Sequence, residues 1–167
     1  VVGFLFYIFP VIWPYLISEL GMTESQLGMV SAFYFIPVAI LAIIIGRALD
    51  KYSVKKFMMI GAIIYAIGLF SLSFINSYWS LLTIYLTILA LGSIMMGNLA
   101  VSKLISNWFD KNAGRALGIA AIGISFSGVV LPWVVDPLLD LVGWRNVYVI
   151  FASVVLFIIL PLIFFTV

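Results

Sequence analysis

Basic residues in this 167-residue chain are confined almost entirely to two short polar gaps between long apolar runs. Of the eight Lys and Arg residues, four belong to the first gap and three to the second gap and its flanks: Arg47, Lys51, Lys55 and Lys56, then Lys103, Lys111 and Arg115. Loops rich in Lys and Arg stay on the cytoplasmic side of a membrane, because their translocation is disfavoured. We therefore expect both gaps to face the cytoplasm, and the other gaps, where Arg145 is the only basic residue, to face outward.

The composition is that of a chain whose solvent is lipid. Hydrophobic residues make up 66% of it and charged residues 8%, with a mean hydropathy of +1.33, whereas a soluble domain carries about 25% charged residues. The sequence contains no Cys and no His, which excludes disulfides, thiol nucleophiles and His-based acid–base or metal chemistry. We expect no cofactor and no metal. The net charge of +2 follows from the two gaps and gives no support for binding to nucleic acid.

Six apolar runs are long enough, at about 20 residues, to cross the roughly 30 Å hydrocarbon core as helices. They are expected at about 1–18, 26–46, 57–75, 80–105, 115–136 and 145–167. An even number of crossings with both basic gaps inside puts both termini in the cytoplasm, for a protein of the plasma (inner) membrane. Pro10 and Pro14 predict a bend in the first run, because each removes a backbone hydrogen bond.

The ends of the chain suggest a fragment. The first run opens at Val1 with no initiator Met and no charged flank, and the last run is still apolar at Val167. A signal peptide does not account for the start, since no positive segment precedes the run and no small-residue cleavage site follows it. We expect half of a larger transporter, with the carboxy-terminal half missing.

A weak internal repeat appears when the sequence is compared with itself at an offset of 90 positions. It pairs Asp50 with Asp140 and Lys55 with Arg145. Three crossings per copy would make the second copy enter from the opposite face, as in inverted-repeat transporters. The predicted fold is therefore all-α and polytopic, with six transmembrane helices as a 3+3 inverted repeat.

The first basic gap reads Gly46-Arg-Ala-Leu-Asp50-Lys-Tyr-Ser-Val-Lys-Lys56. It resembles the signature of the major facilitator superfamily, roughly Gly-x-Leu-Ala-Asp-Arg-x-Gly-Arg-Lys-x after the second helix, although Ser53 stands where Gly is usual. The resemblance implies half of a twelve-helix fold. It also implies an inner gate, because a carboxylate at a helix end can accept hydrogen bonds from a neighbouring helix and pair with nearby bases. The gating residues are then Gly46, Asp50, Lys51, Lys55, Lys56, Asp110 and Arg115.

A second stretch narrows the resemblance. Trp108-Phe109, followed by Arg115-Ala-Leu-Gly-Ile-Ala and later by Gly143-Trp144-Arg145, is similar to the branch containing monocarboxylate transporters and oxalate/formate antiporters. The fifth run also carries small residues at helical spacing, which let membrane helices approach closely. The predicted packing residues are Gly114, Gly118, Gly123, Gly128 and Pro132. Static packing and a moving interface both remain open for this face.

Candidate substrate contacts are neutral, because the middles of the six runs carry no Asp, Glu, Lys or Arg. Any charged ligand for a solute would then belong to the missing half. The family architecture implies that helices one and four line the cavity with help from two and five, which gives Tyr7, Tyr34, Asn98, Ser102 and Ser125. Trp13 and Tyr15 are better explained by the aromatic belt at the membrane surface.

These observations favour a transporter, a symporter or an antiporter, that moves a small solute by alternating access and is not an enzyme. An organic anion such as a monocarboxylate is the favoured solute. A sugar or drug carrier is the alternative within the family, and a stand-alone six-helix channel or membrane scaffold subunit is the alternative outside it. The expected partners are the small-molecule solute, the lipid bilayer and the missing half.

Overall fold

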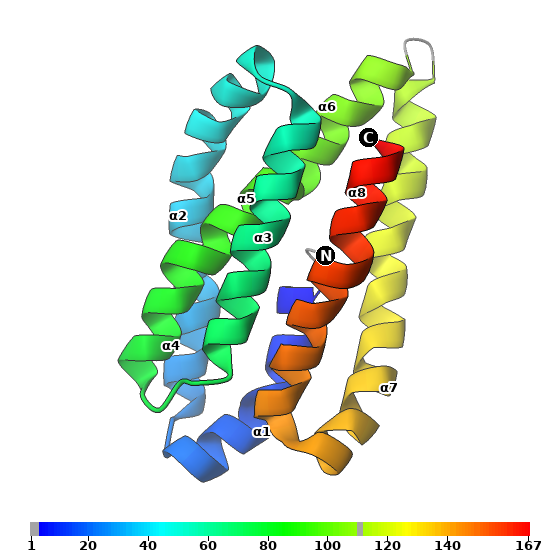
Figure 1. Ribbon diagram of the computed structural model, residues 1–167. Helices are drawn as coiled ribbons and strands as arrows, with labels where there is room; N and C mark the ends of the chain where they lie inside the picture. The colour runs from blue at the N-terminus through cyan, green and yellow to red at the C-terminus, as the bar shows by residue number, and fades with distance from the viewer. Residues whose placement is uncertain (1–3, 110–111) are drawn as a thin grey trace.

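The computed structural model describes residues 4–109 and 112–167, and these fold into helices that run up and down one bundle (Figure 1). In chain order the elements are the π-helical turn η1 (Phe4–Ile8), α1 (Phe9–Leu20), α2 (Glu24–Lys51), α3 (Val54–Leu72), α4 (Tyr78–Ile84), the π-helical turn η2 (Tyr85–Leu89), α5 (Ala90–Met96), α6 (Asn98–Trp108), α7 (Ala113–Val154), the π-helical turn η3 (Val155–Ile159) and α8 (Leu160–Thr166). The described residues form no strand, so the prediction of an all-α fold is confirmed.

Four helical stretches in the described residues are long and apolar enough to cross a membrane: Glu24–Lys51, Val54–Leu72, Tyr78–Trp108 and Ala113–Thr166. Phe6–Leu20 is a shorter apolar helix. The stretch from Ala113 to Thr166 is not one rod, because Gly143 has φ 76° and ψ 159° and interrupts the helix. The chain reverses there, at the lower end of the bundle in Figure 1.

Polar side chains define the helix starts at that lower end. The Thr23 hydroxyl accepts a hydrogen bond from the Gln26 backbone N–H, and the Gln26 side chain accepts one from the Thr23 N–H, at 3.2 and 2.9 Å. Ser77 and Ser80 form the same reciprocal pair before α4. Such capping boxes satisfy backbone donors that have no partner within the helix. The lower turns are therefore fixed by local chemistry.

The turn between α2 and α3 lies at the opposite, upper end and is very short. Only Tyr52 and Ser53 separate the two helices, so α2 continues past the predicted end at residue 46 and α3 begins before the predicted start at 57. The predicted boundaries mark where the apolar residues end. The helices extend further because their backbone hydrogen bonds continue through the polar residues. At 1.5 Å per residue, the 28 residues of α2 span about 42 Å and project beyond a core of roughly 30 Å.

Two of the six prolines, Pro10 and Pro161, follow widened helical turns. The turn η1 directly precedes α1, whose second residue is Pro10, and η3 directly precedes α8, whose second residue is Pro161. A π-helical turn is a common way to absorb the hydrogen bond and the space that proline removes. The predicted disturbance of the first run is thus a widened turn before Pro10 within a continuous helix.

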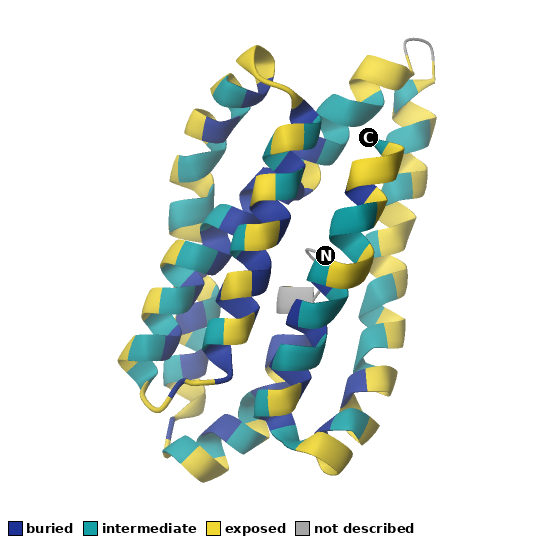
Figure 2. Ribbon diagram, viewed as in Figure 1, coloured by how far each residue is buried: buried dark blue, intermediate teal, exposed yellow. Residues whose placement is uncertain are grey.

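The most closely packed part of the bundle is the contact of α3 with α5 and with the last residue of η2, here called the α3–α5 contact, where buried residues gather (Figure 2). A Cβ atom added to Gly61 or Gly68 on α3 would lie 2.7 Å from Met95 or Leu89, and one added to Gly92 on α5 would lie 2.6 Å from the backbone nitrogen of Tyr65. Only glycine permits so close an approach of two helices. In contrast, residues 113–142 of α7 are mostly exposed within this chain.

Candidate functional site

The long stretch from Tyr78 to Trp108 is broken at Gly97, which has φ −85° and ψ −153°. The backbone is extended there, so α5 ends at Met96 and α6 begins at Asn98. The Gly97 carbonyl accepts a hydrogen bond from the Val101 N–H at 3.0 Å, and no side chain caps the start of α6. The first backbone N–H groups of α6 therefore point along the helix axis toward the break.

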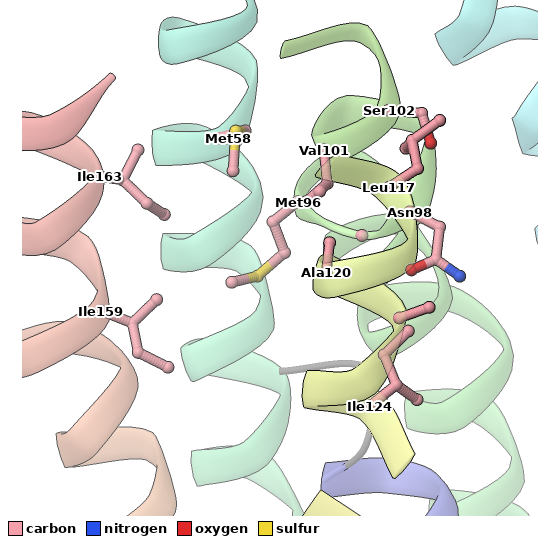
Figure 3. A pocket seen from close by; sticks show the side chains of 12 residues that line it. Met58, Met96, Asn98, Val101, Ser102, Leu117, Ala120, Ile124, Ile159 and Ile163 are labelled. Atoms are coloured by element: carbon pink, nitrogen blue, oxygen red, sulfur yellow. The ribbon is translucent and has the colours of Figure 1, made fainter. Parts of the chain in front are cut away.

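A cavity of about 430 Å³ lies at this break, between α6 and α7, with α3, η3 and α8 on its far side (Figure 3). Its wall is uncharged and mostly apolar. The lining residues are Met58, Met96, Gly97, Asn98, Val101, Ser102, Leu117, Ala120, Ala121, Ile124, Ile159 and Ile163. Small-molecule sites have this size and this predominance of apolar side chains with few polar ones.

Two of the five predicted substrate contacts, Asn98 and Ser102, line this cavity together from successive turns of α6. The other three lie elsewhere. The Tyr34 hydroxyl is 2.5 Å from the Ser93 hydroxyl in the buried core, and Tyr7 packs against α7, where a Cβ on Gly128 would lie 2.7 Å from its ring. Ser125 is exposed on α7 and does not line the cavity. The contact of any of these five side chains with a solute stays a prediction.

Asp50, the predicted gate carboxylate, forms an ion pair with Lys103. The Asp50 Oδ1 and Lys103 Nζ atoms are 2.6 Å apart and join the end of α2 to α6. The two side chains remain partly exposed, at 70% and 38%. We call the end of the bundle that carries this pair and Lys51, Lys55 and Lys56 the basic end; it is the upper end in Figure 1.

Lys103 was not among the predicted gating residues. The predicted gate groups Asp50 with bases that are nearer to it in the sequence. The sequence places Lys103 only among the bases that are expected to face the cytoplasm. A usable signal existed, because a charge on a membrane helix generally has a partner and Asp50 ends a neighbouring run at the same end of the bundle.

The other predicted gating residues have separate surroundings. Lys55 donates a hydrogen bond to the Phe164 carbonyl at 2.7 Å and lies 5.0 Å from the centre of its ring, which ties α3 to α8. Lys51 lies 5.6 Å from the ring centre of Tyr52. Of the four remaining residues, Gly46 is half-buried, and Lys56 and Arg115 are exposed. Asp110 lies outside the described residues, as does Lys111.

A second polar cluster occupies the end opposite to the basic end. The Glu19 carboxylate accepts hydrogen bonds from Arg145 at 2.7 Å and from the Trp144 indole nitrogen at 2.9 Å. The bond from Trp144 and then that from Arg145 hold the pKa of the Glu19 carboxyl below its ordinary value. Nearby, the Tyr15 hydroxyl donates to Asp140 at 3.2 Å. These contacts fasten α1 to both sides of the break at Gly143.

The predicted packing residues of α7 make few close contacts within this chain. A Cβ atom added at Gly114, Gly118 or Gly123 would meet nothing within 4 Å. Gly128 is the exception, since Tyr7 lies against it, and Pro132 is half-buried. Packing of this face against another part of the protein stays a prediction.

The long apolar helices are those of an integral membrane protein, and the described residues add a break in the middle of one helix, an uncharged cavity at that break and polar links at both ends. The family model of the Major Facilitator Superfamily matches residues 1–167, and the chain therefore belongs to this superfamily. The resemblance in the first basic gap is thereby confirmed at the level of the superfamily. This superfamily is one of membrane transporters.

Curated relatives carry transporter names. The chain is 26% identical over 140 residues to MFS-type transporter 1 of Ophiocordyceps sp. (84% of this chain, 31% of the relative). It is 27% identical over 142 residues to the protein named Probable sulfoacetate transporter SauU of Cupriavidus necator (84% and 33%). It is 27% identical over 111 residues to Riboflavin transporter MCH5 of Saccharomyces cerevisiae (65% and 20%). The chain spans a third or less of the length of these relatives.

Proposed function

We propose that this chain is the amino-terminal six-helix bundle of a secondary transporter that moves a small organic solute by alternating access. The observation that carries the proposal is the uncharged cavity of about 430 Å³ at the broken helix in a chain of the major facilitator superfamily. Six crossings follow if the last stretch is divided at Gly143. They lie within residues 4–20, 24–51, 54–72, 78–108, 113–142 and 144–166, whose charged ends lie outside the hydrocarbon core.

Two contacts support a 3+3 inverted repeat. Asp50 at the end of the second crossing binds Lys103 on the fourth. Asp140 at the end of the fifth crossing binds Tyr15 on the first. In a 3+3 repeat the second crossing corresponds to the fifth, and the fourth corresponds to the first. The contact between the second and fourth crossings then corresponds to the contact between the fifth and first crossings, and the two contacts lie at opposite ends of the bundle. Inverted repeats produce this relation.

In this proposal the basic end faces the cytoplasm, because Lys and Arg are retained on that side, and both ends of the bundle's chain lie there. The carboxy-terminal half of the transporter packs on α7, whose residues 113–142 are mostly exposed. The 31–33% coverage of two relatives supports a longer transporter. Asp50 and Lys103 then act as an inner gate that holds α6 against α2 and separates when α6 moves.

An organic anion, such as a monocarboxylate, is the favoured solute. The cavity wall carries no Asp or Glu, and α6 begins at the cavity, where the positive end of its dipole favours a negative group. The Asn98 amide can donate a hydrogen bond to a carboxylate. A relative named for sulfoacetate agrees with an anion, whereas one named for riboflavin favours the alternative, a carrier of larger neutral solutes such as sugars or drugs.

The test is uptake by the complete protein in proteoliposomes. Labelled lactate, oxalate, hexanoate and a neutral sugar are supplied in parallel, with empty liposomes as the control. We expect saturable uptake of at least one carboxylate that unlabelled carboxylates inhibit. Uptake of the sugar alone would transfer the assignment to the alternative, and uptake of none of the four would contradict the anion proposal.

A further inference from the structure

We infer that the cavity at Gly97 binds the hydrocarbon body of the transported acid, so that the preferred substrate is a monocarboxylate with an alkyl chain of several carbons or an aromatic ring. This inference rests on the proposed transport of an organic anion and names its class. Acids of two or three carbons and dicarboxylates would then be poor substrates.

The first argument for this substrate class is the size of the cavity. At about 430 Å³ it lies within the range of about 300–1,000 Å³ that is usual for sites that enclose a drug-sized molecule. A three-carbon acid would fill only a small part of it. The remainder would hold water against side chains that cannot bind water, which is unfavourable.

The second argument is the apolar character of the side chains that line the cavity. Ile159 and Ile163 lie on one side of the cavity, and Leu117 and Ile124 on the other (Figure 3). Met58 and Met96 add flexible thioether side chains, which adapt to ligands of different shape. Each methylene group moved from water onto such a surface contributes about 0.8 kcal/mol, which corresponds to about a fourfold gain in affinity.

The third argument is that the polar side chains of the wall all lie on one side of the cavity. Asn98 and Ser102 both project from α6, beside the uncapped start of that helix. Every other side chain in the wall is apolar. A ligand that satisfies both parts has a single polar head next to α6 and an apolar body directed toward α3, η3 and α8. A dicarboxylate would place its second charge on the apolar side, where burial of a charge is costly.

The experiment measures binding and transport separately with the complete purified protein. The probes are straight-chain alkyl sulfonates of two to eight carbons, which keep their charge and do not cross lipid by diffusion in a neutral form. Binding is followed by the rise in melting temperature in detergent, and transport by inhibition of labelled carboxylate uptake in proteoliposomes. We expect affinity to rise about threefold to fourfold per added carbon until the cavity is filled.

Two variants change the cavity in opposite directions. Ala120→Leu narrows it and is expected to shift the optimum to shorter chains, while Ile124→Ala widens it and is expected to shift the optimum to longer ones. Ile122→Ala is the matched control, because Ile122 lies on the same helix, is 65% exposed and does not line the cavity. Even if one cavity variant fails to fold, the other still tests the shift.

The outcomes separate the two proposals. Affinity that does not depend on chain length, or a length profile that shifts equally in Ile122→Ala and the cavity variants, would overturn the apolar subsite. Length-dependent binding without uptake of any carboxylate would retain the subsite and contradict anion transport. Uptake of lactate or oxalate with no preference for longer chains would do the reverse.

Discussion

The α3–α5 contact and the α6–α7 side of the bundle both contain several glycines, but they use them differently. At Gly61, Gly68 and Gly92 a single added carbon would collide with the neighbouring helix at 2.6–2.7 Å. At Gly114 and Gly118 the same carbon would meet nothing within 4 Å. Glycine in a membrane helix therefore marks a close contact in one region and an open surface in the other, and only the neighbouring helix distinguishes them.

This difference indicates that one region stays fixed during transport while the other moves. The α3–α5 contact joins helices too closely for them to slide, so we expect it to stay fixed in every state of the protein. The helix α6 is held instead by the Asp50–Lys103 pair, and the extended backbone at Gly97 separates it from α5. Movement should occur on that side, around the cavity.

The largest expected effect is on folding, from Gly92→Ala. The added carbon would lie 2.6 Å from the backbone of Tyr65, which cannot rotate away as a side chain can. Overpacking of this kind destabilises by about 3 kcal/mol, so the melting temperature and the yield of folded protein should fall sharply. Gly28→Ala on α2 is the control, because an added carbon there meets nothing within 4 Å and the position lies outside the face of α7 proposed to pack against the other half. Equal melting temperatures for the two variants would contradict the role of Gly92 as a close contact.

The next effect is on transport, from Asp50→Asn. The ion pair with Lys103 is partly exposed, so its loss should change stability by less than about 1 kcal/mol. Uptake by the complete protein should fall roughly tenfold, the effect of about 1.4 kcal/mol on a barrier. Proteoliposome uptake at matched protein levels measures it.

Two further variants test whether Asp50 and Lys103 act as a pair. Lys103→Gln should reproduce the effect, and the double variant should be no worse than either single one, because residues that act as a pair are not additive. Arg47→Gln, an exposed base one turn before Asp50 on α2 and outside the predicted gating set, should transport normally. Additive losses in the double variant would show that the two residues act independently.

A smaller effect is expected from Asn98→Ala at the mouth of the cavity. Loss of one hydrogen bond of about 1 kcal/mol should raise the apparent KM for the solute about fivefold, with little change in melting temperature. Ser106→Ala, on the same helix but outside the cavity wall, should leave the apparent KM unchanged. An unaltered KM in Asn98→Ala would remove the amide from the substrate contacts.

The smallest effect concerns the end opposite to the basic end and depends on pH. Hydrogen bonds from Trp144 and Arg145 lower the pKa of Glu19, so the carboxylate contributes stability above the ordinary carboxyl range. That contribution is lost as the pH falls through the lowered pKa. The melting temperature of Glu19→Gln should therefore lie slightly below that of the wild type at pH 7 and converge with it in acid. A gap that is constant with pH would contradict the assignment.

Hydropathy and charge predicted the helical class, the superfamily motif and the clustering of bases because these are properties of single segments. Asn98 and Ser102 line one cavity, in keeping with the need of polar side chains in an apolar helix for polar surroundings or space, and their contact with a solute stays a prediction. The monocarboxylate branch and the inverted repeat stay predictions.

Contacts between segments were harder to predict. The break at Gly97 lies inside a run that hydropathy presents as continuous, because average apolarity does not report a change in backbone direction. Tyr34 belongs to a suitable helix but turns inward to Ser93. The close packing at Gly61 and Gly92 depends on two helices meeting at a particular register, which no single run encodes.

The two-residue connection between α2 and α3 limits how the gate can open. Three Cα–Cα steps of 3.8 Å allow at most about 11 Å between Lys51 and Val54 in any conformation, so these two helix ends travel together. Opening at this end must therefore separate α6 from a paired unit rather than split the pair. A chemical crosslink between engineered cysteines at positions 51 and 54 should be harmless, whereas one between positions 50 and 103 should arrest the cycle.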